Sequence, residues 1–140
     1  MLKNIICLCL FVLIGCGPSY DQTNEIESLG NQMKYNVPTI KAEPGSKIQI
    51  KFYNGASMDV MKHNIVVLNN KDAIDEVGKA ALTAENNLPD HPSIIAASEM
   101  IGPGESTVLV VNVPIEKGEY PFICTYPGHY QVMQGTIIVK

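Results

Sequence analysis

The sequence predicts an all-β fold, a sandwich or barrel of short strands interrupted by one short helix. Three observations lead to this prediction. Apolar and polar residues alternate with a period of two along most of the chain beyond residue 30, as they do in strands that bury one face. Turns rich in Gly and Pro separate these segments. The 140 residues suffice for one domain with a substantial core, but not for two ordinary domains.

The clearest strand lies around residue 50, where Ile48, Ile50 and Phe52 alternate with polar residues after a Pro-Gly turn. Turns at 102–104 and 116–119 separate the later strands. We expect further strands over residues 32–37, 64–68, 94–97, 107–113, 120–124 and 135–139. A series of short alternating segments with turns between them is typical of an antiparallel sandwich or barrel.

One segment departs from the strand pattern. Over residues 72–85, Ile74, Val77 and Ala81 recur at helical spacing, and Asp72 is available as an N-cap. Gly78 lies inside this segment, where glycine lowers helix stability. We therefore predict a short helical flap inserted between strands.

The N-terminus is typical of an exported lipoprotein. A short positive start precedes the wholly apolar residues 5–14, which are too few to span a membrane. The Leu-Ile-Gly-Cys junction at 13–16 resembles the bacterial lipobox, in which the cysteine becomes the lipid-bearing first residue. We expect a lipoprotein signal peptide over 1–15, lipid attachment at Cys16, a flexible tether over 16–30 and the folded domain over 31–140. This places the protein in the periplasm or cell envelope, attached to a membrane.

Processing at Cys16 changes the number of free thiols. Cys7 and Cys9 leave with the signal peptide and Cys16 is acylated, so Cys124 remains as the one free thiol and no disulfide can form. A lone thiol in an oxidising compartment is prone to oxidation unless something occupies it. Metal ligation is the obvious occupant.

The run from Cys124 to Met133 supplies a thiol, an imidazole and a thioether in one short loop, with His129 between them. Two imidazoles and a thiolate with a weak axial thioether form the ligand set of mononuclear copper electron-transfer sites. The second imidazole must come from His63 or His91. His63 begins an apolar strand and is the plausible ligand, whereas His91 lies between prolines and is expected to be a solvated surface residue.

Several separated segments, in order, make the chain resemble the azurin-like blue-copper proteins of the cupredoxin family. They are residues 32–36, 61–64, 101–106, 124–129 and 135–140. The resemblance implies a cupredoxin-type Greek-key β-sandwich or barrel with one bound copper ion cycling between Cu(I) and Cu(II). It makes His63, Cys124 and His129 the strong ligands and Met133 the weak axial ligand. It also implies that Asn64 hydrogen-bonds across to the Cys124 loop.

The implied function is single-electron transfer between redox proteins such as a cytochrome or a copper reductase. Transient docking is expected near His129, with Met61 and Tyr130 forming a small apolar patch. An enzyme is not expected: the neighbours of Cys124 are not histidines, as transfer to a second copper would need, and Gly128 stands where a binuclear centre would need a second cysteine. With a net charge of −4 and no basic cluster, nothing indicates a nucleic-acid partner, nor is a small-molecule substrate expected.

Two other functions remain as alternatives, and two features depart from the azurin pattern. The main alternative is a copper storage or delivery module that carries no electrons, and the second is a purely structural sandwich. The departures are the missing disulfide and Lys62, which occupies a position where azurin has glycine. An ammonium group there favours reduced copper, so we hypothesise that Lys62 raises the reduction potential.

Overall fold

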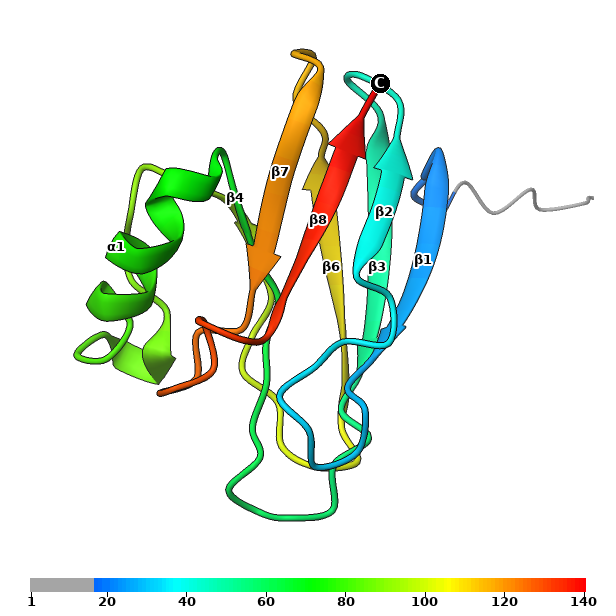
Figure 1. Cartoon of the computed structure of the whole chain (residues 1–140). Helices are drawn as coiled ribbons and strands as arrows, with labels where there is room; N and C mark the ends of the chain where they lie inside the picture. Colours follow the sequence, from blue (N-terminus) through cyan, green and yellow to red (C-terminus); the bar gives the residue numbers. More distant parts are fainter. Residues whose placement is uncertain (1–16) are drawn as a thin grey trace, which may run out of the picture.

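The computed structural model describes residues 17–140, which form two sheets packed face to face (Figure 1). The three-stranded sheet has the order β1-β3-β6 and the five-stranded sheet the order β2-β8-β7-β4-β5. The strands are β1 (Gln22–Glu27), β2 (Thr39–Ala42), β3 (Lys47–Tyr53), β4 (Val66–Leu68), β5 (Ile94–Ala97), β6 (Ser106–Asn112), β7 (Gly118–Ile123) and β8 (Gln134–Val139). The predicted all-β sandwich with one short helix is thus observed.

The sequence predicted an antiparallel arrangement, but both sheets contain parallel and antiparallel pairs. β1 runs parallel to β3, and β2 runs parallel to β8, whereas the other pairs are antiparallel. The reason lies in the connections, because strands paired across long intervening segments need not reverse direction as hairpin strands do. Local alternation identifies strands but carries no information on the direction of a distant partner.

The N-terminal boundary of the domain is the main correction to the sequence prediction. Residues 22–27, assigned to a flexible tether, form strand β1, and its Ile26 is buried in the core. The segment 32–37, predicted as a strand, contains only an isolated bridge from Tyr35 to Ser28, and β2 was not predicted. β1 was not predicted because polar residues, Gln22 and Asn24, occupy two of its inward-facing positions, so that its sequence shows little alternation of apolar and polar residues.

The main core lies between the two sheets. It is built from alternate residues of the facing strands and includes three large fully buried aromatic rings, those of Tyr35, Phe52 and Phe122. Tyr35 contacts both of the other rings, with centroid separations of 5.8 and 5.3 Å. Cys124 and Met133 belong to the same core cluster. The candidate site is therefore continuous with the hydrophobic interior.

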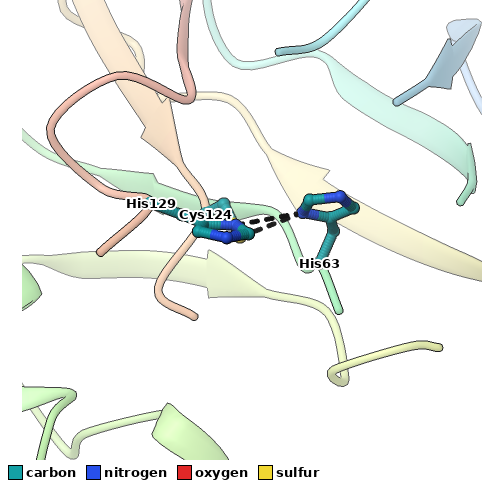
Figure 2. Close-up of side chains that lie close together, drawn as sticks. All are labelled: His63, Cys124 and His129. Atoms are coloured by element: carbon teal, nitrogen blue, oxygen red, sulfur yellow. Dashed lines mark hydrogen bonds between the residues drawn. The ribbon is translucent and has the colours of Figure 1, made fainter. Parts of the chain in front are cut away.

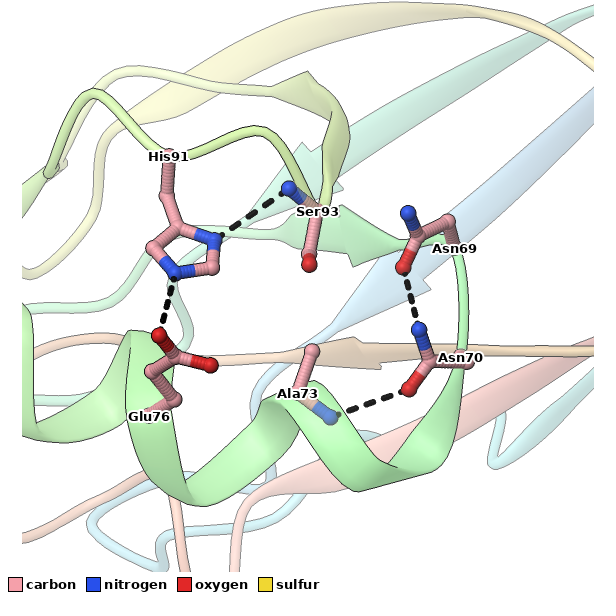
Figure 3. Close-up of polar contacts among 6 residues, drawn as sticks. All are labelled: Asn69, Asn70, Ala73, Glu76, His91 and Ser93. Atoms are coloured by element: carbon pink, nitrogen blue, oxygen red, sulfur yellow. Dashed lines mark hydrogen bonds and ion pairs between the residues drawn. The ribbon is translucent and has the colours of Figure 1, made fainter.

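The helical flap covers the outer face of the five-stranded sheet (Figure 1). It consists of a 3-10 turn (Lys71–Ala73), α1 (Ile74–Ala80) and a second 3-10 turn (Glu85–Asn87). The packing of α1 on β4 and β7 leaves β4 buried on both faces. The cap at the start of the flap belongs to the first 3-10 turn and is Asn70, not Asp72 as predicted. The Asn70 side chain accepts a hydrogen bond from the Ala73 amide at 3.1 Å (Figure 3).

The predicted signal peptide and the lipid site at Cys16 lie outside the described residues. Within residues 17–140, no helix is both long and apolar enough to cross a membrane.

Candidate metal centre

Three buried side chains from separate parts of the chain meet at one end of the sandwich. His63 precedes β4, Cys124 follows β7, and His129 lies in the loop between β7 and β8. Their exposed fractions are 0%, 0% and 4%. The Nδ1 atoms of His63 and His129 are 3.2 Å apart, and the Cys124 sulfur lies 3.7 and 3.6 Å from them (Figure 2). Together they form a group of donors able to hold a metal ion.

The size of this triangle matches a single metal ion. A point equidistant from the three atoms lies about 2 Å from each, close to the length of a bond from a metal such as zinc to imidazole nitrogen, about 2.0–2.1 Å, and slightly short of one to thiolate, about 2.3 Å. A small set of soft and borderline donors in a near-trigonal arrangement suits copper. The residues present therefore fit a copper ion.

The loop between β7 and β8 owes its tight form to Pro127 and Gly128. Gly128 has a φ of +83°, and the His129 amide donates to the Tyr126 carbonyl at 3.0 Å. Proline followed by a left-handed glycine inside such a bond is the pattern of a type II turn. The Met133 amide then donates to the His129 carbonyl at 2.8 Å, and the Met133 carbonyl accepts from the Cys124 amide at 3.1 Å. Met133 is completely buried, and these two backbone bonds tie it to His129 and Cys124.

His63 is held by a framework that the sequence analysis did not identify. Its amide and carbonyl bond to Ile101 at 3.0 and 2.9 Å. The buried Asn54 side chain donates to the carbonyls of Met61 and Ile101, at 2.8 and 3.2 Å, and accepts from the Ser28 hydroxyl at 3.0 Å. Single polar residues of this kind give no pattern in a sequence, so only their burial in the fold identifies them.

Asn64 links the two halves of the site, as the family resemblance implied. Its side-chain nitrogen donates to the Thr125 hydroxyl at 2.8 Å, and its oxygen accepts from the Thr125 amide at 2.8 Å. The Asn64 carbonyl accepts from the Tyr35 hydroxyl at 2.6 Å. All three residues are buried. The expected cross-link between the His63 segment and the Cys124 loop is confirmed.

Comparison with known proteins decides the family. The model of copper-binding proteins of the plastocyanin/azurin family matches residues 22–140. The chain belongs to this family. It is similar to auracyanin-A of Chloroflexus aurantiacus, with 33% identity covering 90% of this chain and 77% of that protein. It is also similar to azurin of Pseudomonas aeruginosa, with 28% identity over 100% of both chains. A solved structure, reduced auracyanin from Roseiflexus castenholzii, has a TM-score of 0.78 and 32% identity, covering 89% of this chain and 99% of that one.

Membership confirms three expectations drawn from the sequence. The protein is an azurin-like blue-copper protein, its fold is the all-β cupredoxin sandwich, and its cofactor is copper. As a member of this family of electron carriers it is not an enzyme.

Burial keeps both imidazoles of this cupredoxin neutral. It lowers the pKa of His63 to about 4, with a smaller contribution from the neighbouring His129, and it also lowers the pKa of His129. Burial raises the pKa of the Cys124 thiol to about 11, although the backbone N–H groups of Asn64 and Tyr126 act in the opposite direction. At neutral pH the imidazoles therefore offer free lone pairs, and a metal ion must displace the thiol proton.

His91 lies outside the cupredoxin site, as expected. It was also predicted to be a solvated surface residue, and that prediction is wrong. Its side chain is only 13% exposed, with Nε2 lying 3.3 Å from a Glu76 carboxylate oxygen on α1. Nδ1 accepts from the Ser93 amide at 3.2 Å (Figure 3). The imidazole therefore joins the 88–93 loop to the flap, a contact that only the tertiary structure brings about.

The predicted apolar patch around His129 also needs correction. Tyr130 is only 8% exposed and packs under the flap, so it is not a surface residue. Met61 is half-buried. The large apolar side chain exposed in the ligand loop is instead Val132, at 59%.

Lys62, the departure from the azurin pattern, is exposed, and its backbone needs no glycine. Asn86 and Asn87 are the only non-glycine residues with positive φ within residues 17–140, so Lys62 adopts an ordinary conformation. Its side chain lines a shallow pocket together with Tyr126 and Glu105. Tyr126 in turn packs edge-on against His129, with 4.9 Å between ring centroids. Lys62 thus lies close to the metal centre but in solvent.

Proposed function

We propose that this protein carries single electrons between redox partners in the bacterial cell envelope. His63, Cys124 and His129 would hold the copper ion as strong ligands, and Met133 would be a weaker fourth ligand. The observation that carries this proposal is the triangle of buried donor atoms, whose sides of 3.2, 3.6 and 3.7 Å match a single metal ion. Bound copper supplies the one-electron change between Cu(I) and Cu(II).

The protein contributes a rigid cage. Asn64 holds the Cys124 loop to the His63 segment by two hydrogen bonds, and the Asn54 framework holds that segment to Ile101. Because donors in a close-packed core move little, neither oxidation state requires much rearrangement of the protein. Burial excludes water from the site and keeps other ligands from the metal.

Electron exchange with partners takes place at the ligand loop. Residues 124–133 contain no charged side chain, and Val132 on this loop is exposed. An uncharged surface close to His129 suits brief contacts with several redox proteins, such as a cytochrome or a copper reductase, because small interfaces dissociate quickly.

Attachment to the membrane follows from the N-terminal motif. Residues 1–15 are the signal peptide and Cys16 carries the lipid. Asp21 is hydrogen-bonded to the Lys47 backbone and Tyr20 lies against the Lys47 side chain, so the spacer consists of residues 17–19, for which a flexible coil spans about 10 Å. The domain therefore begins near residue 20, and the shorter spacer keeps it closer to the membrane than a tether ending at residue 30 would.

Copper storage or delivery is the alternative function, and burial of the donors argues against it. A delivery protein exchanges ligands with its target, which requires donors within reach. His63 and Cys124 are completely buried and His129 is 4% exposed. Transfer of the ion would require the Asn64 and Asn54 contacts to open.

The first test is the visible spectrum of the processed domain after one equivalent of copper(II). We expect an intense thiolate-to-copper charge-transfer band that is absent in Cys124→Ser and unchanged in His91→Gln, which removes an imidazole outside the site. A colourless wild-type protein would overturn the copper assignment.

The second test separates an electron carrier from a metal store. Stopped-flow mixing of the oxidised copper protein with reduced cytochrome c should bleach the band rapidly while the copper remains bound. Loss of copper to a competing apoprotein without electron exchange would favour storage instead.

A further inference from the structure

The residue directly after His129 joins the ligand loop to the helical flap. Tyr130 is 8% exposed and packs in the cluster between α1 and the five-stranded sheet. Its carbonyl accepts a hydrogen bond from the Gln134 side chain at 2.7 Å. The ring and the backbone of this residue are therefore both fixed, one peptide unit away from a proposed copper ligand.

The ring of Tyr130 lies directly on the backbone of α1 at Gly78. A Cβ atom at Gly78 would lie 2.3 Å from the ring carbons Cγ and Cδ2, far inside contact distance. Glycine within a helix lowers its stability by about 1 kcal/mol relative to alanine. This helix therefore carries an unfavourable residue where the Tyr130 ring lies against its backbone, and the lack of space for a side chain there explains the glycine.

The hydroxyl group of Tyr130 provides a second attachment to the same helix. It donates to Oδ1 of Asp75 at 3.2 Å, and Oδ2 of that carboxylate accepts from Lys79 at 2.6 Å. The hydrogen bond from Lys79 lowers the pKa of Asp75, with a smaller lowering by Tyr130. The acceptor is therefore ionised at neutral pH, and hydrogen bonds to charged groups are stronger than neutral ones.

The flap is itself firmly seated. Val77 and Ala81 are completely buried, Asn70 caps the preceding turn, and Glu76 contacts His91 on the other side of the helix. On the ligand side, the His129 carbonyl accepts from the amides of Val132 and Met133 at 3.0 and 2.8 Å. A shift of Tyr130 would thus move His129 and the turn that leads to Met133.

We propose that Tyr130 is a positioning residue for His129, and that α1 is the fixed surface against which it holds the ligand loop. The proposal rests on the proposed ligand role of His129. The flap is then a functional part of the metal centre and not only a cover for the sheet.

The test compares Tyr130→Phe and Gly78→Ala with the control Glu76→Gln. Tyr130→Phe removes the bond to Asp75 and keeps the ring, whereas Gly78→Ala displaces the ring while improving helix propensity. Glu76→Gln weakens the flap contact to His91 and leaves Tyr130 untouched. The first readout is amide hydrogen exchange of Val132 and Met133 in the copper-free protein, measured relative to the amides of β3.

We expect exchange of these two amides to rise about fivefold in Tyr130→Phe, because the hydrogen bond that ties the Tyr130 ring to α1 is lost. In Gly78→Ala the rise should exceed about tenfold without a matching loss of global stability, and in the control it should stay within about twofold. Equal rises in the control and in Gly78→Ala, or no rise in Tyr130→Phe, would overturn the proposal. If Gly78→Ala fails to fold, Tyr130→Phe decides.

The second readout uses the copper-loaded protein. Copper loss to a chelator should be faster in Tyr130→Phe than in the control, and faster still in Gly78→Ala. The charge-transfer band should shift in the same order. A role of Tyr130 in stability alone would not shift the band. An unchanged band and unchanged copper loss in both variants would contradict the proposal. If the wild-type protein forms no such band, the proposed function fails, and the exchange measurement on the copper-free protein still tests the positioning of the loop.

Discussion

Asn64 uses both polar atoms of its side chain to join segments that lie 61 residues apart in sequence. Each bond is buried, so the loss of Asn64 leaves the Thr125 amide without a partner in the interior. An unsatisfied buried donor is more costly than a lost exposed hydrogen bond. At the scale of single residues, this cross-link determines how His63 faces Cys124.

Asn64→Ala should lower the free energy of unfolding of the copper-free protein by about 2–4 kcal/mol, because two buried hydrogen bonds are lost and a donor is orphaned. Urea denaturation followed by circular dichroism measures this change. Asn31→Ala is the control, since Asn31 accepts from Ser57 and Met58 but is exposed, and its effect should stay below about 1 kcal/mol. Equal losses in both variants would contradict the argument from burial.

Lys62→Gly should lower the reduction potential, because the nearby positive charge that favours Cu(I) over Cu(II) is then absent. The change should not exceed about 40 mV, equivalent to about 1 kcal/mol for one electron, since the side chain lies in solvent. Protein-film voltammetry at low and high salt measures it, and the difference should shrink as salt screens the charge. An unchanged or higher potential in the variant would refute the effect of Lys62.

The stability of the copper-free protein should depend on pH in two ranges. The folded pKa of His63 is about 4, below the value of 6.5 for a free histidine. The unfolded chain therefore binds more protons between these values, and the free energy of unfolding falls as pH falls from about 6.5 to about 4. The Cys124 pKa of about 11 exceeds the ordinary 9.0, so stability also falls as pH rises between those values.

Thermal unfolding across a pH series measures both arms of this profile. Cys124→Ser should remove the fall in stability that begins near pH 9 and leave the acidic arm in place, because serine does not ionise in that range. A fall above about pH 10 should remain, because burial raises the pKa of Tyr35 well above its ordinary value. A wild-type profile that stays flat from pH 4 to pH 11 would show that the burial of these groups does not affect their protonation.

At the scale of elements, the sequence pattern of the flap correctly predicts a helix but assigns its N-cap to the wrong residue. The helical spacing of Ile74, Val77 and Ala81 predicted a helix there, and Val77 and Ala81 are buried as expected. Aspartate is a favourable N-cap residue, but the first 3-10 turn of the flap begins at Lys71, so that Asp72 lies inside the turn. Asn70, in extended conformation, provides the cap instead.

Asn70→Ala should destabilise the copper-free protein by about 1 kcal/mol, because the Ala73 amide loses its acceptor. Asp72→Ala, the matched control in the same turn, should change stability by less than half of that amount, since Asp72 caps nothing. Chemical denaturation of both variants compares them directly. A larger effect of Asp72→Ala would restore the cap predicted from the sequence.

At the scale of the whole molecule, the candidate ligands come from segments that lie far apart in the sequence. His63 lies just before β4, which pairs between β7 and β5 in the five-stranded sheet, and the other donors lie within the β7–β8 connection. A ligand that binds the folded chain and not the unfolded one stabilises the fold by mass action. Copper would therefore provide a cross-link, in a mature chain for which the sequence predicts no disulfide.

Removal of copper should lower the unfolding temperature markedly. At a free copper concentration about 1,000 times the dissociation constant, binding contributes about 4 kcal/mol. Differential scanning calorimetry with and without a chelator measures the difference, which should be greatly reduced in Cys124→Ser. Identical unfolding temperatures for the two forms would show that the site does not couple to the fold.

The sequence by itself determined the fold class, the helical insertion, the strands after residue 45 and the four candidate copper ligands. The first three depend on local periodicity, and the ligands depend on the spacing of chemically distinctive residues together with the resemblance to a known family. The tertiary structure alone decided the rest. Strand β1, the parallel pairings and the contact of Tyr130 with Gly78 depend on partners distant in the chain, as do the Asn54 framework and the burial of His91. Each of them follows from which surfaces pack together, and a local pattern carries no information about its distant neighbour.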